Sequence, residues 1–218
     1  MDTMEIIRAR HSVRQYTDKK IEPEKRGILT SEIEKINQES GLHIQILFDE
    51  PTCFHSRRTH YGFFSGVANY IALVGKKSAD LEEKCGYYGE RLVLLAQSIG
   101  LNSCWVAMTH GKSTSDIRPG EKETCLIALG YGRTQGVLHK SKDYSKVTQV
   151  KGQAPEWFRT GMEAVLLAPT AINQQKFLFT FDGENVHAKV NGFGFYSKMD
   201  LGIVKYHFEA VTGKKVLP

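Results

Sequence analysis

Apolar side chains recur along the chain at spacings that separate helices from strands. Spacings of three and four residues predict helices over residues 3–10, 23–39 and 155–167, in a segment that ends at Gly100, and in a last one that begins near Asp200, a good N-cap residue. Alternating or continuous apolar runs predict strands over residues 43–49, 69–75, 102–108, 123–132 and 176–182. Because helices and strands are mixed without strict βαβ alternation, the pattern favours an α+β fold built in layers.

The order of these elements repeats along the chain. A helix leads into a strand over residues 23–49 and again over residues 155–182, and an amphipathic helix follows each unit. The repeat predicts one domain, residues 1–218, made of two similar halves of about 1–150 and 151–218. Two such halves can pack face to face as an internal pseudo-dimer that shares one core.

Composition narrows the classes of function. The 218 residues are 41% hydrophobic and 24% charged, which is typical of globular proteins. The net charge is +5, but the basic residues are scattered among 24 acids, so we expect no nucleic-acid partner. No apolar run reaches the ~20 residues that cross a bilayer, and none resembles a signal peptide, so a soluble protein without a membrane partner is expected. The four cysteines lack metal-ligand spacing, which favours reduced thiols in a cytoplasm and no metal site.

Three polar segments carry candidate chemistry. Residues 8–16, RARHSVRQY, hold three arginines, a histidine and a serine, which suit a phosphate-bearing ligand. Lys140 and Lys142 alternate in an extended segment, so both ammonium groups can reach one anion. Residues 168–175, APTAINQQ, place hydroxyl and carboxamide groups where the chain turns into a strand, and carboxamides suit a flat heterocycle with carbonyls and ring nitrogens. Taken singly, each segment also fits a solvated turn or charge run; together they predict a site that neutralises a phosphate and recognises a ring.

These residues resemble the motifs of the nitroreductase superfamily of FMN-dependent oxidoreductases. Four motifs carry the resemblance: R-x-S-x-R-x-Y at Arg10, Ser12, Arg14 and Tyr16; GLxSCW at residues 100–105; LGY at residues 129–131, followed by Lys140, Ser141 and Lys142; and P-S-x-x-N-x-Q at Pro169, Thr170, Asn173 and Gln175. In most of the family the last motif follows the second helix, where this chain has QESGLHIQ, residues 38–45. The good copy comes about 130 residues later, an order that resembles the TM-type nitroreductase subgroup.

The resemblance implies a nitroreductase-like mixed sheet flanked by helices, with one composite FMN site. Arg10, Ser12, Lys140 and Lys142 would hold the phosphate, and Arg14 would reach the pyrimidine edge of the ring. Asn173 and Gln175 would bond ring carbonyls or the ribityl chain, while residues 107–111 would offer a backbone N–H to flavin N5. The cofactor-binding set also contains Pro169, Thr170 and His11, although a turn histidine is an equal alternative for His11. No catalytic side chain is expected, because hydride transfer needs none.

The implied activity is that of an FMN-dependent oxidoreductase that passes hydride from NAD(P)H through N5 to a nitroaromatic, quinone or similar small-molecule acceptor. The chain is expected to be a monomer, as a pseudo-dimer, or a homodimer. A flavin-binding or sensing module without turnover remains an alternative, as do dehalogenation and flavin breakdown on the same scaffold. The loop cluster His55, Arg57, Arg58 and His60 is a candidate for an anionic group of NAD(P)H, and a mobile exposed loop is its alternative.

Overall fold

The computed structural model describes residues 1–217, except the side chains of Arg58 and His60, and divides the chain into two compact units. Unit 1 comprises Met1–Ala9, Glu82–Arg91 and His139–Pro218, and unit 2 comprises Arg10–Leu81 and Leu92–Leu138. Both are mixtures of helices and strands, which confirms the predicted α+β class. The two similar halves of a pseudo-dimer stay a prediction.

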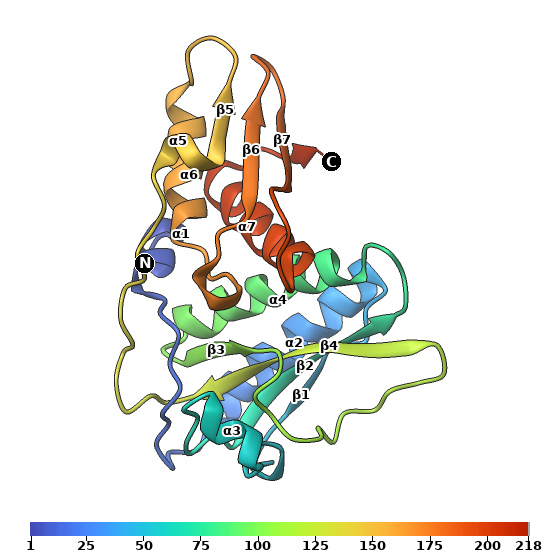
Figure 1. Ribbon diagram of the computed structural model, residues 1–218. Helices are drawn as coiled ribbons and strands as arrows, with labels where there is room; N and C mark the ends of the chain where they lie inside the picture. Colours follow the sequence, from blue (N-terminus) through green and yellow to red (C-terminus); the bar gives the residue numbers. More distant parts are fainter. Residues whose placement is uncertain (218) are drawn as a thin grey trace. The chain divides into compact units, whose positions relative to one another are not determined.

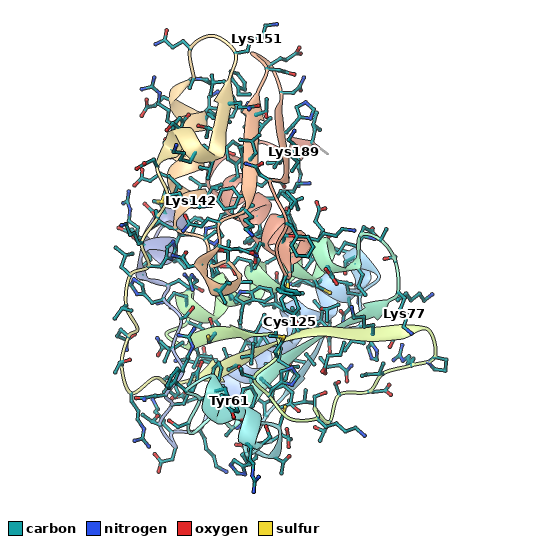
Figure 2. All side chains as sticks on the ribbon, in the orientation of Figure 1. Tyr61, Lys77, Cys125, Lys142, Lys151 and Lys189 are labelled. Carbon is teal, nitrogen blue, oxygen red and sulfur yellow. The ribbon has the colours of Figure 1, made fainter. Side chains whose placement is uncertain are left out.

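Unit 2 is built on a four-stranded antiparallel sheet in the order β1-β2-β4-β3. Its longest pairing joins β2 to β4, where Asn69 lies opposite Leu129 and Ile71 opposite Ile127. Cys125 lies in the middle of β4, and Tyr61 ends the short helix α3 with an exposed ring (Figure 2). The elements of this unit are α2 (Pro23–Ser40), β1 (Gln45–Leu47), η1 (Thr52–Phe54), α3 (Arg57–Tyr61), β2 (Asn69–Lys76), β3 (Asn102–Val106) and β4 (Glu121–Gly130) (Figure 1).

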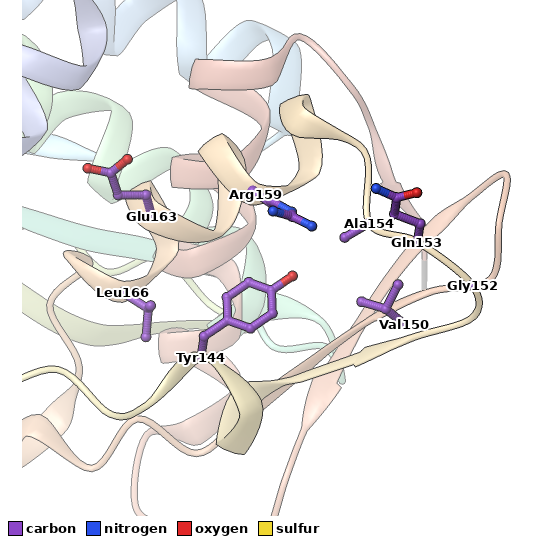
Figure 3. A pocket seen from close by; sticks show the side chains of 8 residues that line it. All are labelled: Tyr144, Val150, Gly152, Gln153, Ala154, Arg159, Glu163 and Leu166. Carbon is purple, nitrogen blue, oxygen red and sulfur yellow. The ribbon is translucent and has the colours of Figure 1, made fainter.

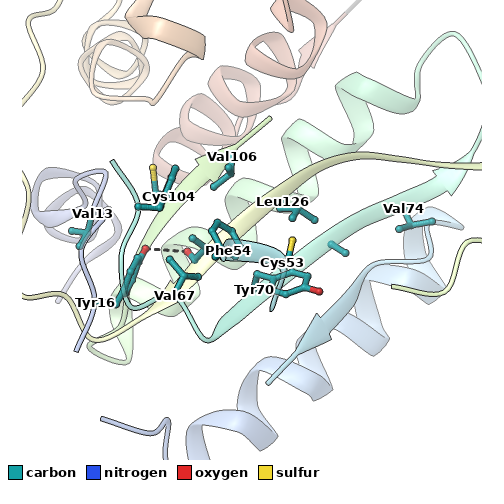
Figure 4. Packing of buried hydrophobic residues seen from close by; sticks show 13 residues of the cluster. Val13, Tyr16, Cys53, Phe54, Val67, Tyr70, Val74, Cys104, Val106 and Leu126 are labelled. Carbon is teal, nitrogen blue, oxygen red and sulfur yellow. Dashed lines mark hydrogen bonds between the residues drawn. The ribbon is translucent and has the colours of Figure 1, made fainter. Parts of the chain in front are cut away.

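Alternation along the strands of unit 2 sends side chains to both faces of its sheet. One face carries a cluster that includes Tyr16, Tyr70, Cys104 and Leu126, in which the Tyr16 hydroxyl donates to the Ala128 carbonyl at 3.3 Å (Figure 4). A second cluster joins α2, β4, the last turns of α4 (Leu81–Ser98) and the residues just before α2 and just after α4: Ile21, Leu29, Ala96, Leu101 and Leu129. The sheet of unit 2 is therefore covered on both faces, and its strands read as nearly continuous apolar runs.

Unit 1 is built on a second four-stranded sheet, in the order β5-β6-β7-β8. The central pair β6–β7 is antiparallel and both outer pairs are parallel. The first turns of α4 also belong to this unit, so α4 continues from one unit into the other. The remaining elements are α1 (Thr3–Ala9), α5 (Tyr144–Val147), β5 (Thr148–Val150), α6 (Glu156–Leu166), η2 (Ala171–Asn173), β6 (Phe177–Phe181), β7 (Val186–Val190), α7 (Ser197–Thr212) and β8 (Val216–Leu217) (Figure 1).

Aromatic rings fill the core of unit 1. Phe158 of α6, Phe179 of β6 and Phe208 of α7 are fully buried, and the ring of Phe208 lies 5.4 Å from that of Phe179 and 5.7 Å from that of Phe158. These distances suit favourable tilted and edge-to-face ring pairs. The strand and the two helices are thus held by one cluster, and α7 lies at its centre.

Two sequence predictions of helix starts differ from the structure in an informative way. Pro155 is the N-cap residue of α6, one position before the helix, where a missing N–H costs nothing. Helix α7 begins at Ser197, three residues before the predicted start near Asp200, and its N-cap Tyr196 has a left-handed φ of 59°. The carboxylate of Asp200 does not cap its own helix, because it bonds a loop instead. None of the helices over residues 1–217 is both long and apolar enough to cross a bilayer.

Candidate functional site

The basic opening segment is held in unit 2 by backbone hydrogen bonds. Val13 N–H donates to the Ser103 carbonyl at 3.0 Å, and Ser12 pairs with Ser103 in a parallel bridge beside β3. Tyr16 N–H donates to the Ser65 carbonyl at 2.9 Å, which fixes the other end of the segment. The segment therefore lies extended along the sheet, and the two motifs R-x-S-x-R-x-Y and GLxSCW meet.

Three predicted phosphate and ring ligands of this segment gather around one buried thiol. Arg10 is 4% exposed and Cys104 is 3% exposed. Burial raises the pKa of the Cys104 thiol, and the Arg14 guanidinium, a hydrogen bond with Ser12 and the Arg10 guanidinium oppose that rise. Two guanidinium groups and a hydroxyl therefore share one small region, while the thiol remains protonated at neutral pH and is a poor nucleophile.

His11 lies where the chain of unit 2 returns after β4. A Cβ atom added to Gly136 would come within 2.7 Å of the His11 Cβ and 2.9 Å of the Ser12 carbonyl oxygen. Gly136 also has a φ of 74°, a conformation that side chains rarely adopt. The small distance and the positive φ explain why position 136 is a glycine. The backbone of His11 and Ser12 therefore lies directly beside Gly136.

The lysine segment and the amide-rich loop meet in unit 1, although more than 25 residues separate them. The Lys142 N–H donates to the Gln175 Oε1 at 2.8 Å, and the Lys142 Nζ donates to the Gln175 carbonyl at 2.9 Å. The carboxamides of Asn173 and Gln175 donate to the Lys140 carbonyl at 2.9 and 3.0 Å. The hydroxyl of Ser141 donates to the Leu166 carbonyl at the end of α6, at 2.7 Å. These bonds make residues 140–142 and 169–175 one locally rigid body.

The amide-rich loop stores backbone strain. Ile172, Asn173 and Gln175 have φ values of 48°, 56° and 46°, in the left-handed region that non-glycine residues rarely adopt. Gln175 is 4% exposed, and its N–H donates to the Thr170 hydroxyl at 3.1 Å. Such strain persists only where the surroundings determine the conformation, and it clusters at functional sites.

Asp200 in the first turns of α7 anchors this loop through two hydrogen bonds. Its two carboxylate oxygens accept from the Ala171 N–H at 2.9 Å and from the Gln174 Nε2 at 2.7 Å. Burial raises the pKa of Asp200 to about 6, and the two hydrogen bonds from Gln174 and Ala171 oppose part of that rise. Sequence reasoning missed this role, because the side chain acts across 29 residues of sequence.

Comparison with known proteins places the chain in a family. The model of a family described as "Putative TM nitroreductase" matches residues 2–212, nearly the whole chain. The protein is a member of the TM nitroreductase family. No curated protein matches the chain.

Solved structures support the fold of this TM nitroreductase family member. A protein described as a "putative nitroreductase" from Thermotoga maritima is 22% identical and has a TM-score of 0.69, with 97% of this chain and 83% of the other covered. A "putative nitroreductase in complex with FMN" from Desulfovibrio desulfuricans is 20% identical with a TM-score of 0.52, covering 66% and 93%. A nitroreductase with bound FMN from Bacteroides fragilis is 20% identical with a TM-score of 0.50, covering 69% and 100%. At these identities the likeness shows the fold, a nitroreductase-like fold.

The predicted site residues of this family member fall into two sets. Unit 2 brings Arg10, Ser12 and Arg14 to the start of β3, and unit 1 brings Lys140 and Lys142 to the loop after Pro169. A single ligand shared by both sets stays a prediction. Within the described residues no cluster of His, Cys, Asp or Glu suits a metal ion.

A surface cavity of about 820 Å³ in unit 1 lies outside the predicted set (Figure 3). Its wall combines the ring of Tyr144, the guanidinium of Arg159 and the carboxylate of Glu163, which pairs with Arg8 at 2.6 Å. None of the predicted site residues lines this cavity. The sequence motifs therefore mark a different part of unit 1.

The raised pKa of Asp200 makes a stability prediction. The folded-state value of about 6 exceeds the ordinary value of 3.8, so the folded protein binds the proton more tightly than the unfolded chain. The contribution of Asp200 is therefore fully present at low pH and is lost as pH rises through about 6. Between pH 5 and pH 8 we expect the wild type to lose ~1.4 kcal/mol of unfolding free energy relative to Asp200→Asn, which does not titrate. Urea unfolding of both proteins at the two pH values measures this; a constant difference would contradict it.

Proposed function

We propose that the protein is an FMN-dependent oxidoreductase. The observation that carries the proposal is the hydrogen-bonded union of the lysine segment with the amide-rich loop in unit 1. These hydrogen bonds hold a basic motif and an amide-rich motif of the family next to each other. Membership of the TM nitroreductase family and FMN in two structurally similar proteins support the cofactor assignment.

The donor chemistry fits the phosphate of FMN. The Lys140 side chain is exposed and makes no hydrogen bond or ion pair to any described residue, so its ammonium group is available to an anion. Lys142 is held at the loop by its bond to the Gln175 carbonyl. With Arg10 and Ser12, these residues form the proposed phosphate ligands. Charge-assisted bonds of this kind contribute about 1.5–3 kcal/mol each before desolvation.

The remaining residues of the proposed set suit the ring and the ribityl chain. Arg14 is exposed, so its guanidinium is available to a pyrimidine edge, where a cation favours the anionic reduced ring. Asn173 is also exposed, although its carboxamide bonds Lys140 and Gln175. The Gln175 carboxamide is buried, with bonds to Lys140, Lys142 and Asn173. We therefore assign direct recognition to Asn173, and loop shape to Gln175, Pro169 and Thr170.

The proposed chemistry needs no acid, base or nucleophile from the chain. FMN held by the proposed residues would supply the redox chemistry, which is uptake of hydride from NAD(P)H and two-electron reduction of a nitroaromatic, quinone or similar acceptor, with the remaining protons from solvent. The backbone of residues 107–111 would position the reacting edge, and His11 would lie beside it through its backbone. Cys104 is buried and its raised pKa keeps its thiol neutral, so it does not compensate the positive charge of the arginines. The chain's own contribution is to bind, orient and balance charge.

Reduction of the bound flavin tests the proposal. We expect the purified protein to carry FMN, and NADH or NADPH to bleach its visible absorbance under anaerobic conditions, with recovery on adding a nitroaromatic or quinone. Lys140→Ala should weaken FMN binding by about tenfold, the loss of one charge-assisted bond. Lys151→Ala, an exposed lysine elsewhere in unit 1, is the matched control.

Two results would count against this function. A protein with no affinity for FMN would contradict the cofactor assignment. A bound flavin that neither NADH nor NADPH reduces would instead favour a flavin-binding or sensing module without turnover. The acceptor class, a cytoplasmic location, and a monomeric or homodimeric state remain parts of the proposal.

A further inference from the structure

Unit 2 contains a surface pocket of about 1200 Å³ that the proposed FMN set does not use. Its lining includes Met108, His110 and Lys112 from the loop after β3, and Ser56 and Arg57 at the start of α3. The Gly111 N–H donates to the Cys53 carbonyl at 2.7 Å, which ties the loop after β3 to η1. The pocket is thus framed by two segments that a backbone bond holds together.

Two cations line this pocket. The side chains of Arg57 and Lys112 are both exposed, and neither side chain makes an ion pair or hydrogen bond with any residue that the structure describes. The one carboxylate of the wall, Glu123, accepts from the hydroxyls of Ser113 and Ser115, the latter at 2.7 Å. The lining therefore combines two exposed cations with one carboxylate that already accepts hydrogen bonds from two serines. The side chains of Arg58 and His60, also expected to bind an anion here, lie outside the described residues.

The same pocket has an apolar side. Met108 is 68% exposed and Ile117 is 48% exposed, although both are large apolar side chains. Ligand sites combine such apolar surface with a few polar groups that fix orientation, and their volumes reach about 1000 Å³. A pocket of this size suits a ligand with a charged end and a large organic body better than it suits a free inorganic ion.

We propose that this pocket binds a phosphate group of the dinucleotide electron donor, through Arg57 and Lys112. Two cations from different segments suit the negative charge of a phosphate, and the Arg57 guanidinium can bond two of its oxygens. The nucleotide body lies against Met108 and Ile117. Because Met108, His110 and Gly111 line the pocket, the donor would end beside the loop that the proposed function assigns to flavin N5. The identity of the ligand rests on the proposed function, whereas binding of the nucleotide can be measured without any flavin or turnover.

Two sources of phosphate are distinguishable: the diphosphate shared by both dinucleotides and the 2′-phosphate found only in NADP. Calorimetric titration with NAD⁺ and NADP⁺ measures binding without turnover. The double variant Arg57→Ala/Lys112→Ala should weaken binding by about tenfold, a discounted value for exposed charges. An equal loss for both nucleotides identifies the diphosphate, and a loss for NADP⁺ alone identifies the 2′-phosphate. The charge-preserving pair Arg57→Lys/Lys112→Arg should restore most of the affinity.

Lys151→Ala/Lys189→Ala removes two exposed charges from unit 1 and serves as the control (Figure 2). Unchanged binding of both nucleotides by the pocket double variant would overturn the proposal. So would a wild-type protein that binds FMN but neither nucleotide. A protein that binds NADP⁺ at this pocket without binding FMN would overturn the proposed function and leave the pocket assignment intact.

Discussion

Gly202→Ala is expected to destabilise the protein by about 3 kcal/mol, the upper range for overpacking a core. A Cβ atom at position 202 of α7 would lie 1.9 Å from the Glu83 carbonyl oxygen and 2.6 Å from the Tyr87 nitrogen of α4. Both are main-chain atoms, so neither can rotate away as a side chain would. The two helices must therefore separate, and the surrounding packing of unit 1 is lost.

The opposite helix provides an independent test of the same contact. A Cβ atom on Gly86 of α4 would lie 2.0 Å from the Met199 carbonyl oxygen of α7, so Gly86→Ala should be similarly destabilising. Gly27→Ala is the matched control: Gly27 lies inside α2 with no atom within 4 Å of the added Cβ. There the better helix propensity of alanine should stabilise the protein by about 0.5–1 kcal/mol. Urea unfolding measures all three; a Gly202→Ala protein as stable as the wild type would contradict the close approach.

The second large effect is expected at a buried pair in the same unit. The Nε2 of His207 lies 2.9 Å from the Glu90 Oε1, and its Nδ1 lies 2.9 Å from the Ala164 carbonyl oxygen. Both side chains of the pair are completely buried. Removing one partner leaves a buried polar or charged group without its main contact, which typically costs about 3–5 kcal/mol. Glu90→Ala should therefore lower the unfolding free energy by about 3 kcal/mol or more.

A double variant separates the net contribution of the pair to the unfolding free energy from the cost of leaving one buried partner unpaired. Glu90→Leu/His207→Leu removes both polar groups, and apolar replacement of a buried pair is often nearly neutral. We expect it to be less destabilised than the sum of the two single leucine variants. Glu163→Ala, which breaks the exposed pair with Arg8, should change stability by less than about 1 kcal/mol. Equal effects of Glu90→Ala and Glu163→Ala would contradict this view of the pair.

Both contacts bear on the candidate site through α7. The same helix carries Gly202, His207 and Asp200, and Asp200 bonds the loop that follows Pro169. Packing of α7 against α4 therefore fixes the position of Asp200, which in turn holds the strained loop. We expect destabilised variants of this contact to bind FMN more weakly as well, although the changed residues touch no proposed ligand.

Periodicity predicted most of the fold because long amphipathic segments carry a strong local signal. The helix predicted over residues 23–39 is found at Pro23–Ser40, and the strand predicted over residues 69–75 is found at Asn69–Lys76. Short elements such as α5 and β8 were missed, since two to four residues hold too few positions to show a period. The sequence prediction also lacks the hairpin strand β7, although its five residues VHAKV alternate between apolar and polar side chains as a half-buried strand does.

The candidate site residues stay a prediction, but the structure shows which of them lie together locally. Residue types and motif spacing identified Lys140, Lys142 and Asn173, and the structure brings these together in unit 1. Motifs do not report contacts between side chains. Only the structure shows that Asp200 anchors the loop and that the Gln175 carboxamide donates to Asn173. The buried pairing of His207 with Glu90 likewise has no sequence signal.

The crystal structure of the protein soaked with FMN tests the central claim most directly. The account predicts one bound flavin whose phosphate oxygens lie at about 3 Å from Arg10 and a lysine of the 140–142 segment, with Asn173 beside the ring or ribityl chain. Flavin density remote from both residue sets, or Arg10 and Asn173 on opposite faces of the molecule, would contradict it.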